Sequence, residues 1–227
     1  MAEVRTTTRQ RRIRGLDAGE RREQRRRQLL DAALDLFAEQ GYANTSIEQI
    51  CQTAYVGTKS FYELFDSKEA CYLALLERTS QEISERVVAA LDAAPDDERV
   101  AARLLLSAFA HALVDDPRIA RTTFGGAAGI SPAVERQRRA NRRWSAGFLE
   151  DVWARYGAAT PKTAAARRSL HRLAVGTIGG LFDLVVDWLH DVEGDDGTAG
   201  QPDVDTLIDD LTAFYDVVRD GLAHRGR

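Results

Sequence analysis

The chain has 227 residues, of which 44% are hydrophobic and 29% charged, so it is long enough for one or two packed domains. Its longest segment without a charged residue, 122–134, contains three glycines and a proline and is too short to cross a bilayer. No apolar segment of a secretory signal follows the N-terminal charges, and two cysteines are too few for a disulfide framework. These features disfavour secreted, membrane-spanning and disordered chains and predict a cytoplasmic globular protein that does not contact a membrane.

The net charge of −4 conceals an asymmetry between the two ends of the chain. Residues 1–30 contain ten arginines and four acids, whereas residues 183–220 contain twelve acids and one arginine. Such polarity is typical of a chain that presents one end to a polyanion. A solvated basic tail without a partner is the alternative.

Apolar residues recur with a period of 3.6 along most of the chain, whereas sustained alternation of period two is missing from the sequence, so we predict an all-α fold. A mobile basic arm is expected at 1–20, a helix-turn-helix domain at 21–67 and a larger helical domain at 68–227. The first helix is expected from about Arg21 to Gln40, and Gly41 is suited to end it.

Two short helices are expected next. Thr45 stands three residues before Glu48, a capping-box spacing that predicts the start of a second helix ending near Thr53. A third begins after residues 54–57, and a fourth runs from Asp66 or Ser67 to about Leu91. Five more helices are predicted near 97–115, 117–124, 131–157, 161–191 and 203–224, several of which have a proline near the start. The glycine-rich acidic segment 193–202 is expected to be a loop.

A longer amphipathic helix followed by two short ones joined by a tight turn is the layout of a helix-turn-helix. The expected core of this motif is Leu30, Leu34, Phe37, Ile47, Ile50, Val56, Phe61 and Phe65. The third helix then exposes Thr58, Lys59, Ser60, Tyr62 and Glu63, which are groups able to read base edges in a major groove. An ordinary helical corner inside a bundle is the alternative.

The strings Thr45-Ser46-Ile47, Ile50-Cys51, Ala54-Tyr55-Val56-Gly57, 60–65 and Ser67-Lys68-Glu69 resemble the N-terminal domain of TetR-type (TetR/AcrR) transcriptional regulators over about residues 25–76. The resemblance implies a bacterial homodimeric repressor that a small apolar or amphipathic effector releases from a palindromic DNA operator, without a metal, cofactor or catalytic residue. It implies phosphate contacts for Thr45, Tyr62 and Lys68 and base contacts around 58–60. The full set of expected DNA contacts is Thr45, Ser46, Tyr55, Gly57, Thr58, Lys59, Ser60, Tyr62 and Lys68.

Three residues depart from the family pattern. Family members usually have Gly where this chain has Tyr55, Ser or Thr where it has Gly57, and often Gly where it has Lys59. Because tyrosine tolerates a positive φ poorly, we expect the turn either to be strained by on the order of 1 kcal/mol or to adopt another geometry. Tyr55 could alternatively reach the DNA itself, and Gly57 remains an acceptable N-cap.

The two last predicted helices each have an extended apolar face. By resemblance they form a four-helix dimer interface with those of a second chain, and packing inside a monomer is the alternative. The interface residues are expected to be Gly176, Ile178, Leu181, Val185, Trp188, Leu207, Leu211, Tyr215 and Val218.

The resemblance also implies an apolar effector cavity in the larger domain, although aromatic residues at helical spacing belong more often to an ordinary core than to a pocket. Five arginines in 135–143 fit a solvated face better than a clamp for an anionic ligand. Expected lining residues are Tyr72, Leu76, Phe109, His111, Leu113, Phe124, Trp144 and Phe148.

Enzyme motifs are missing from the sequence: it has no P-loop, no H-E-x-x-H, no C-x-x-C and no G-x-S-x-G. Cys51 and Cys71 fit core positions better than a thiol switch. A constitutive DNA-binding or architectural protein without an effector, and a helical carrier or enzyme using the same cavity, are the alternative functions.

Overall fold

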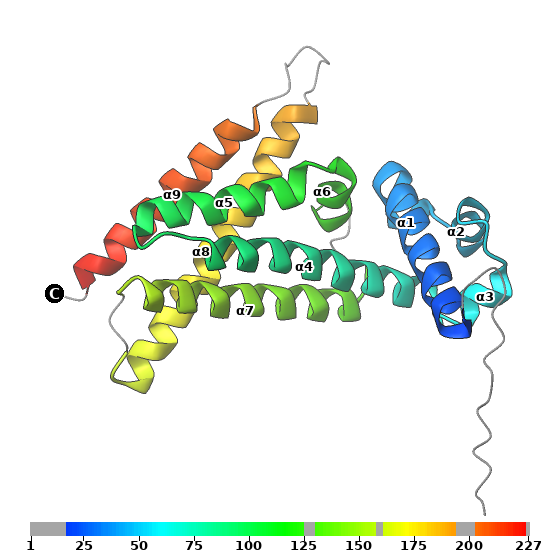
Figure 1. The fold of residues 1–227 in the computed structure, drawn as a ribbon, viewed down its shortest axis with the longest axis horizontal. Coiled ribbons are helices and arrows are strands. Elements are labelled where there is room, and N and C mark those ends of the chain that lie inside the picture. The colour runs from blue at the N-terminus through cyan, green and yellow to red at the C-terminus, as the bar shows by residue number, and fades with distance from the viewer. Residues whose placement is uncertain (1–16, 125–129, 158–160, 194–202, 226–227) are drawn as a thin grey trace, which may run out of the picture. The chain divides into compact units, whose positions relative to one another are not determined.

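The computed structural model describes residues 17–124, 130–157, 161–193 and 203–225, and all regular elements in these residues are α-helices (Figure 1). The all-α prediction is therefore confirmed. The helices are α1 (Ala18–Asn44), α2 (Ile47–Thr53), α3 (Thr58–Tyr62), α4 (Lys68–Asp92), α5 (Glu98–Val114), α6 (Pro117–Phe124), α7 (Pro132–Arg155), α8 (Ala164–Glu193) and α9 (Val204–Arg225). Most of the arm expected at 1–20 and most of the loop expected at 193–202 lie outside the described residues.

The ends of the first two helices differ from the prediction. Asp17 accepts a hydrogen bond from the Glu20 amide at 2.8 Å in a capping box, so α1 begins before the predicted Arg21. Gly41 has φ 79° and breaks the helical path of α1 where its end was expected. The prediction that Thr45 caps α2 is wrong: Ser46 is the N-cap, and Gln49 completes its capping box at 2.7 Å.

The chain divides into two compact units between Leu75 and Leu76, inside α4, whereas the domain boundary was expected between 67 and 68. The first turns of α4 belong to the N-terminal unit because they complete its core. Tyr72 is buried there, and its ring lies edge-on to that of Phe37, with 5.3 Å between the centroids.

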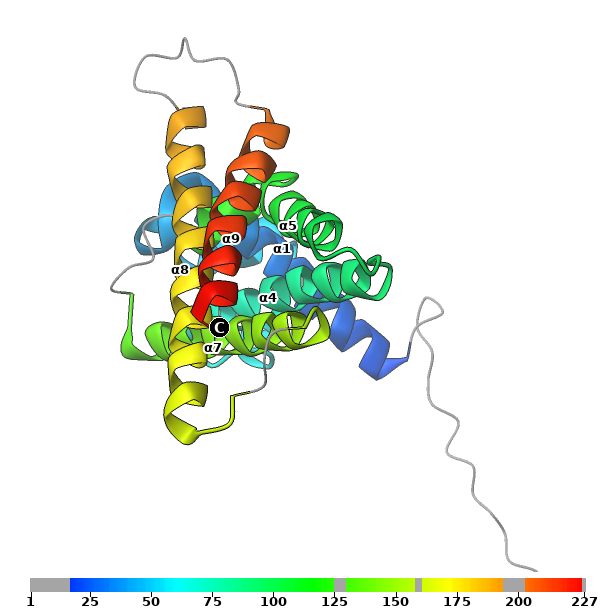
Figure 2. The same ribbon diagram turned by 90° about the vertical axis from the view of Figure 1, so that its left-hand side faces the viewer.

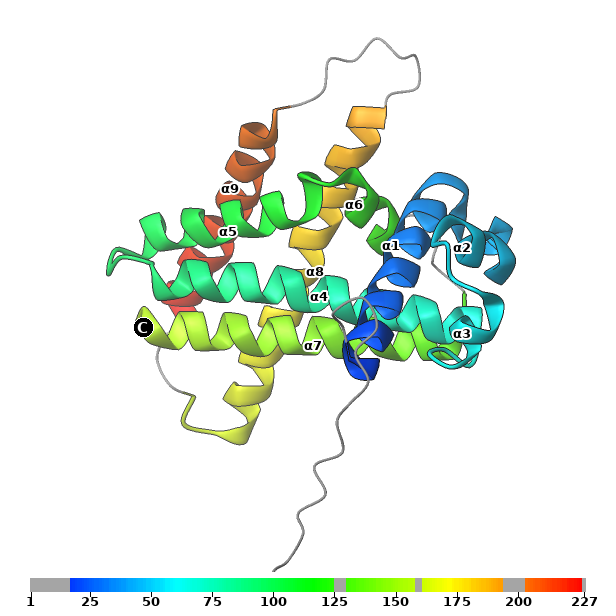
Figure 3. The same ribbon diagram turned by 45° about the vertical axis from the view of Figure 1, so that its right-hand side comes forward.

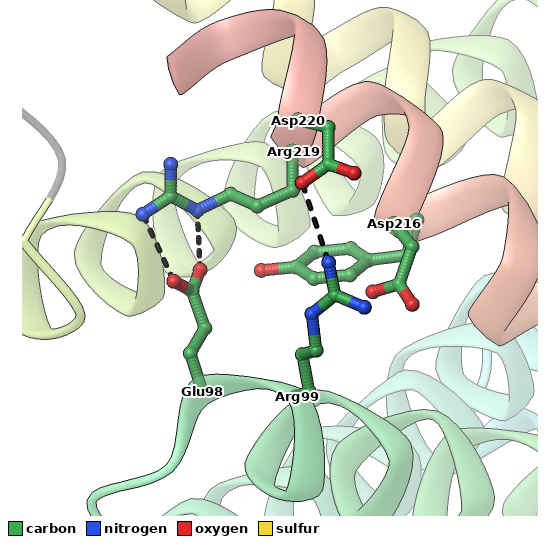
Figure 4. A pocket seen from close by; sticks show the side chains of 6 residues that line it. Glu98, Arg99, Asp216, Arg219 and Asp220 are labelled. Carbon is green, nitrogen blue, oxygen red and sulfur yellow. Dashed lines mark hydrogen bonds and ion pairs between the residues drawn. The ribbon is translucent and has the colours of Figure 1, made fainter.

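The C-terminal unit is built from the rest of α4 and from α5–α9. The axes of α4, α5 and α7 are nearly aligned in Figure 3, with α5 running in the direction opposite to the other two, and α8 packs against α7 and α9. A continuous core joins the helices of this unit, with Trp153, Leu113 and Leu211 fully buried. Ion pairs connect α5 to α9: Glu98 with Arg219, and Arg99 with Asp220 at 3.6 Å (Figure 4).

Within the described part of the chain, α8 is long and apolar enough over Ala164–His190 to cross a membrane, by length and composition alone. Yet α8 also supplies Ala174, Leu181 and Val185 to the core, as a packed helix of a globular unit does. Only 22% of the most apolar stretch of this helix is buried. The helix therefore has more apolar surface than its own chain covers.

Most of the residues expected at a dimer interface are instead used inside the chain. The prediction is wrong for five of them, which are buried in the core: Leu181, Val185, Leu207, Leu211 and Tyr215. Ile178, Trp188 and Val218 are half-buried and pack against the same core, and Gly176 is exposed. The apolar face of each helix was identified correctly, but it packs inside the unit, where α8 contacts α7 and α9, and α9 contacts α5 and α8.

Gly180 explains how α8 and α9 approach each other. A Cβ atom at this position would lie 2.6 Å from Cζ of Phe214 on α9, which is too close for any carbon contact. At Gly176 the same construction meets nothing within 4 Å. The close approach between α8 and α9 therefore occurs at Gly180, whereas a side chain at Gly176 would meet open space within this chain.

Candidate nucleic-acid interface and ligand cavity

The first three helices form a small core of their own. Phe61 of α3 is fully buried, as are Leu30 of α1 and Ile50 of α2. Leu34, Phe37, Val56 and Phe65 complete this core, and Ile47 is half-buried. The predicted helix-turn-helix core is thus confirmed, and it holds α3 by one face.

The turn between α2 and α3 carries the expected strain. Tyr55 has φ 53° and is the one non-glycine residue with positive φ in the described chain. Its side chain is 96% exposed, so no packing offsets the cost of this conformation, which is on the order of 1 kcal/mol. Gly57 is the N-cap of α3, as expected, with φ −65° and no side-chain cap.

The outer surface of α3 is polar. Thr58 and Lys59 are exposed, Ser60 is half-buried, and Tyr62 is 53% exposed with its ring edge-on to Phe61. α3 is only five residues long, but the Phe65 amide still donates to the Phe61 carbonyl at 2.8 Å, which extends the helical turn. The helix therefore presents a short, rigid row of hydrogen-bonding groups.

Two arginines of α1 brace this motif. Nη2 of Arg22 donates to the carbonyl oxygen of Glu63 at 3.4 Å, and the Arg26 guanidinium lies 5.9 Å from the centroid of the Phe65 ring. Part of the arginine-rich N-terminal segment is thus helical and contacts the end of α3. Cys51 and Cys71 are buried and are not joined in a disulfide, and burial raises the pKa of the Cys51 thiol, which disfavours the reactive thiolate.

The C-terminal unit contains a cavity of about 520 Å³, within the range of small-molecule sites. Residues of α4, α5, α7 and α8 line it, together with Tyr215 of α9. Leu105, Phe109 and Phe182 are among its apolar lining residues. Uncharged polar side chains of α4 and α7 also line it: Ser80, Gln81, Ser84, Gln137, Asn141 and Ser145.

Residues 29–75 match the family model of bacterial regulatory proteins of the tetR family. This chain carries the N-terminal domain of the tetR family. The regulator TcmR of Streptomyces glaucescens is 38% identical over 73 residues, which are 32% of this chain and 30% of that protein. The activator FasR of Mycolicibacterium smegmatis is 32% identical over 116 residues, or 51% of this chain and 52% of that protein. The matches thus span between about a third and a half of these curated relatives.

Over most of its length the chain shares the all-helical fold of solved TetR-type regulators. The transcriptional regulator FadR of Bacillus subtilis, solved in complex with stearoyl-CoA, superposes with a TM-score of 0.62 over 86% of this chain and 96% of that chain. The sequence identity of 20% supports a common fold and nothing finer.

Two of the contacts that the TetR resemblance implies need correction. Thr45 is only 2% exposed, and its hydroxyl donates to the Gly41 carbonyl at 2.8 Å, so this side chain is turned away from any DNA surface. Lys68 uses its ammonium inside the unit, where it donates to the carbonyl oxygens of Tyr42 and Thr45, each at 2.7 Å. Burial lowers the pKa of Lys68. The half-exposed Ser46 is the hydroxyl at the start of α2.

Three of the eight residues expected at the effector cavity line it: Phe109, Trp144 and Phe148. The prediction is wrong for the other five. Tyr72, Leu76 and Leu113 are buried in cores, His111 pairs with Asp115 at 2.8 Å, and Phe124 packs edge-on against Phe182.

The polar lining of the cavity was missed. A signal for it exists in the sequence, because Gln137, Asn141 and Ser145 recur every four residues on α7, as do Ser80 and Ser84 on α4. From the sequence alone such a stripe is assigned to a solvated helix face, because the spacing of polar residues does not reveal what that face contacts in the folded chain.

Proposed function

We propose that this chain is a TetR-type DNA-binding transcriptional regulator that places α3 in the major groove. The main support for a DNA-reading α3 is the contrast between two neighbouring residues: Phe61 is fully buried, whereas Tyr62 is 53% exposed. A helix fixed by one face can hold the side chains of its other face in register with base edges.

The DNA contacts follow from exposure. Thr58, Lys59 and Ser60 stand at the N-terminal end of α3, the part of a recognition helix that reads bases. Phosphate contacts are proposed for Tyr62, which is exposed, and for Ser46, which is half-exposed. Tyr55, exposed at the tip of the turn, adds a phenol hydroxyl beside them.

A homodimer is expected because one small helix-turn-helix binds weakly, while two related by a two-fold axis read a palindrome. Figure 2 shows α8 and α9 side by side. Their exposed residues, rather than the buried ones, would form the four-helix interface: Val175 and Gly176 on α8, and Ala213, Val217 and Gly221 on α9.

The cavity is the site proposed for an effector that favours a conformer with the wrong half-site spacing. Inverting a 99:1 population requires about 5.5 kcal/mol of differential affinity between the two conformers. We propose that the regulator acts as a repressor. Because FasR is an activator, a reporter assay on the selected promoter is used to distinguish repression from activation. FadR was solved with stearoyl-CoA bound, so a long-chain acyl thioester is the ligand against which other candidate effectors of this chain are compared.

Two other functions are compatible with an all-helical fold of this kind. A constitutive DNA-binding protein would need no fillable cavity, so the 520 Å³ cavity favours an effector-responsive regulator over it. A helical carrier or enzyme would bind the same ligands without selecting a DNA sequence.

Selection of bound sites from random duplex DNA, with the full chain at constant salt, tests the proposal. We expect an enriched palindrome that Lys59→Ala relaxes at one symmetric pair of positions. Lys162→Ala is the matched control, because Lys162 is an exposed lysine of the other unit. Binding without enrichment that vanishes at moderate salt would reduce the interaction to phosphate contacts and overturn the proposal.

A further inference from the structure

Two adjacent stripes of α7 line the cavity, and they differ in chemistry. Gln137, Asn141 and Ser145 form an uncharged polar stripe, while Trp144 and Phe148 form an aromatic one. Both recur every four residues, so each runs along the helix. A ligand lying along α7 would therefore meet an aromatic surface beside a row of hydrogen-bonding groups.

The aromatic stripe is flat and open. The rings of Trp144 and Phe148 are stacked with 12° between their planes and 5.8 Å between their centroids. Trp144 is 50% exposed, and it is the exposed tryptophan among the described residues of the cavity wall. An indole in water at the rim of a cavity gains free energy when a second flat ring covers it.

The polar stripe is organised by hydrogen bonds across the cavity wall. Nδ2 of Asn141 donates to Oγ of Ser80 on α4 at 2.5 Å, and Nε2 of Gln137 donates to Oδ1 of Asn141 at 2.9 Å. These bonds orient the two amides. Each amide nitrogen carries a second proton, and the Ser80 hydroxyl can also donate, so the stripe can bind hydroxyl or carbonyl oxygens.

The charge of the lining excludes an anionic head group. Among the described residues that line the cavity, Glu77 is the one with a formal charge, and it is exposed at the rim. Lysine, arginine and histidine do not occur in this lining. Tyr215 stays neutral as well, because burial raises the pKa of its phenol. An anion entering here would lose its hydration without gaining a cationic partner.

We propose that the cavity binds an uncharged, flat aromatic molecule that carries hydroxyl or carbonyl groups along one edge. Its ring face stacks on Trp144, and its polar edge meets Asn141, Gln137 and Ser80. This proposal rests on the proposed function in one respect, because it takes the effector of the regulator to bind in this same cavity.

Calorimetric titration of the full chain with 1,8-dihydroxyanthraquinone tests the ligand class. We expect saturable binding that quenches tryptophan fluorescence. The sulfonated derivative of the same ring system, which adds an anion, is expected to bind at least about tenfold more weakly. 1-Dodecanol, which is neutral but not flat, is expected to bind more weakly than the quinone, as is stearoyl-CoA.

Two variants assign the binding to the two stripes. Trp144→Ala is expected to weaken quinone binding about tenfold, and Asn141→Leu about fivefold. Val100→Ala, at an exposed position of α5 outside the lining, is the control and leaves the affinity unchanged. Equal or tighter binding of the sulfonate, of dodecanol or of stearoyl-CoA overturns the proposal, as does no binding of the quinone or no effect of Trp144→Ala.

The titration contains no DNA, so its result is separate from that of the site selection. An enriched palindrome together with a failed titration would leave the regulator in place and reject the ligand class. Saturable quinone binding without any enriched site would reject the regulator and leave a carrier of flat neutral compounds.

Discussion

The ammonium of Lys68 donates a hydrogen bond to the carbonyl oxygen of Tyr42 at 2.7 Å and lies 4.3 Å from the centroid of the Tyr42 ring. A second bond of 2.7 Å reaches the Thr45 carbonyl. Lys68 thereby gives the Tyr42 carbonyl a second donor beside the Thr45 amide, which lies at 3.4 Å, and it gives a donor to the carbonyl of Thr45, the C-cap residue of α1. It ties the start of α4 to the segment that enters α2, so the stability of the helix-turn-helix depends on it.

We therefore expect Lys68→Met to destabilise the N-terminal unit by about 1–3 kcal/mol, because two part-buried carbonyls lose a charged donor. Urea unfolding followed by circular dichroism measures the loss. Lys162→Met, at an exposed lysine, is the control and is expected to leave the transition in place. An unchanged transition for Lys68→Met would show that these two hydrogen bonds do not stabilise the unit.

Relief of the strained turn should stabilise the same unit. Tyr55→Gly is expected to raise the free energy of unfolding by about 1 kcal/mol, because glycine adopts φ 53° without a Cβ penalty. Tyr55→Ala removes the same exposed ring but keeps the penalty, so it should be close to neutral. If both variants also lose DNA affinity, the phenol touches DNA. Equal stability of the Gly and Ala variants would contradict the strain.

Two glycines of α8 should respond to alanine with opposite signs. Gly179→Ala is expected to stabilise the C-terminal unit by about 0.5–1 kcal/mol, since the new methyl group would meet nothing within 4 Å and alanine favours the helix. Gly180→Ala is expected to destabilise it by about 1–2 kcal/mol, because the methyl group must displace the ring of Phe214. Thermal unfolding of both variants measures the difference. Stabilisation by both would show that Phe214 moves aside freely.

The proposed dimer surface can be tested at a position that the chain itself does not bury. Val217 is 73% exposed, so Val217→Asp should leave the fold intact and yield monomers on size-exclusion chromatography with light scattering. Val100→Asp, an exposed valine on α5, is the matched control and should not alter the mass. A Val217→Asp protein that remains dimeric would place the interface elsewhere.

The pair of Glu98 and Arg219 should contribute to the docking of α5 on α9 (Figure 4). Nη2 of Arg219 also donates to the Tyr156 carbonyl at 3.1 Å. Because the pair is largely shielded from solvent, we expect Arg219→Met to cost about 1–3 kcal/mol. Adding Glu98→Gln to that variant should cost less than Glu98→Gln costs alone, which a double-mutant cycle of urea unfolding resolves. Additive losses would show that the two side chains do not interact.

The sequence by itself determined the helices and the small core that holds α3. Apolar residues at a period of 3.6 and turn residues between them are local signals, so positions such as Phe61 and Ile50 were correctly assigned to the core. The positive φ at Tyr55 was one of the two outcomes expected from the TetR resemblance, because family members usually have Gly at this position.

Only the tertiary structure decided which surface covers each apolar or polar face. Leu211 and Val185 have the same periodicity whether they meet a second chain or other helices of their own unit, and they are buried in the core of this chain. Lys68 reads as a phosphate ligand until the carbonyls of Tyr42 and Thr45 are placed beside it. Periodicity fixes the direction in which a side chain leaves its helix, whereas the partner it meets depends on contacts between residues far apart in the chain.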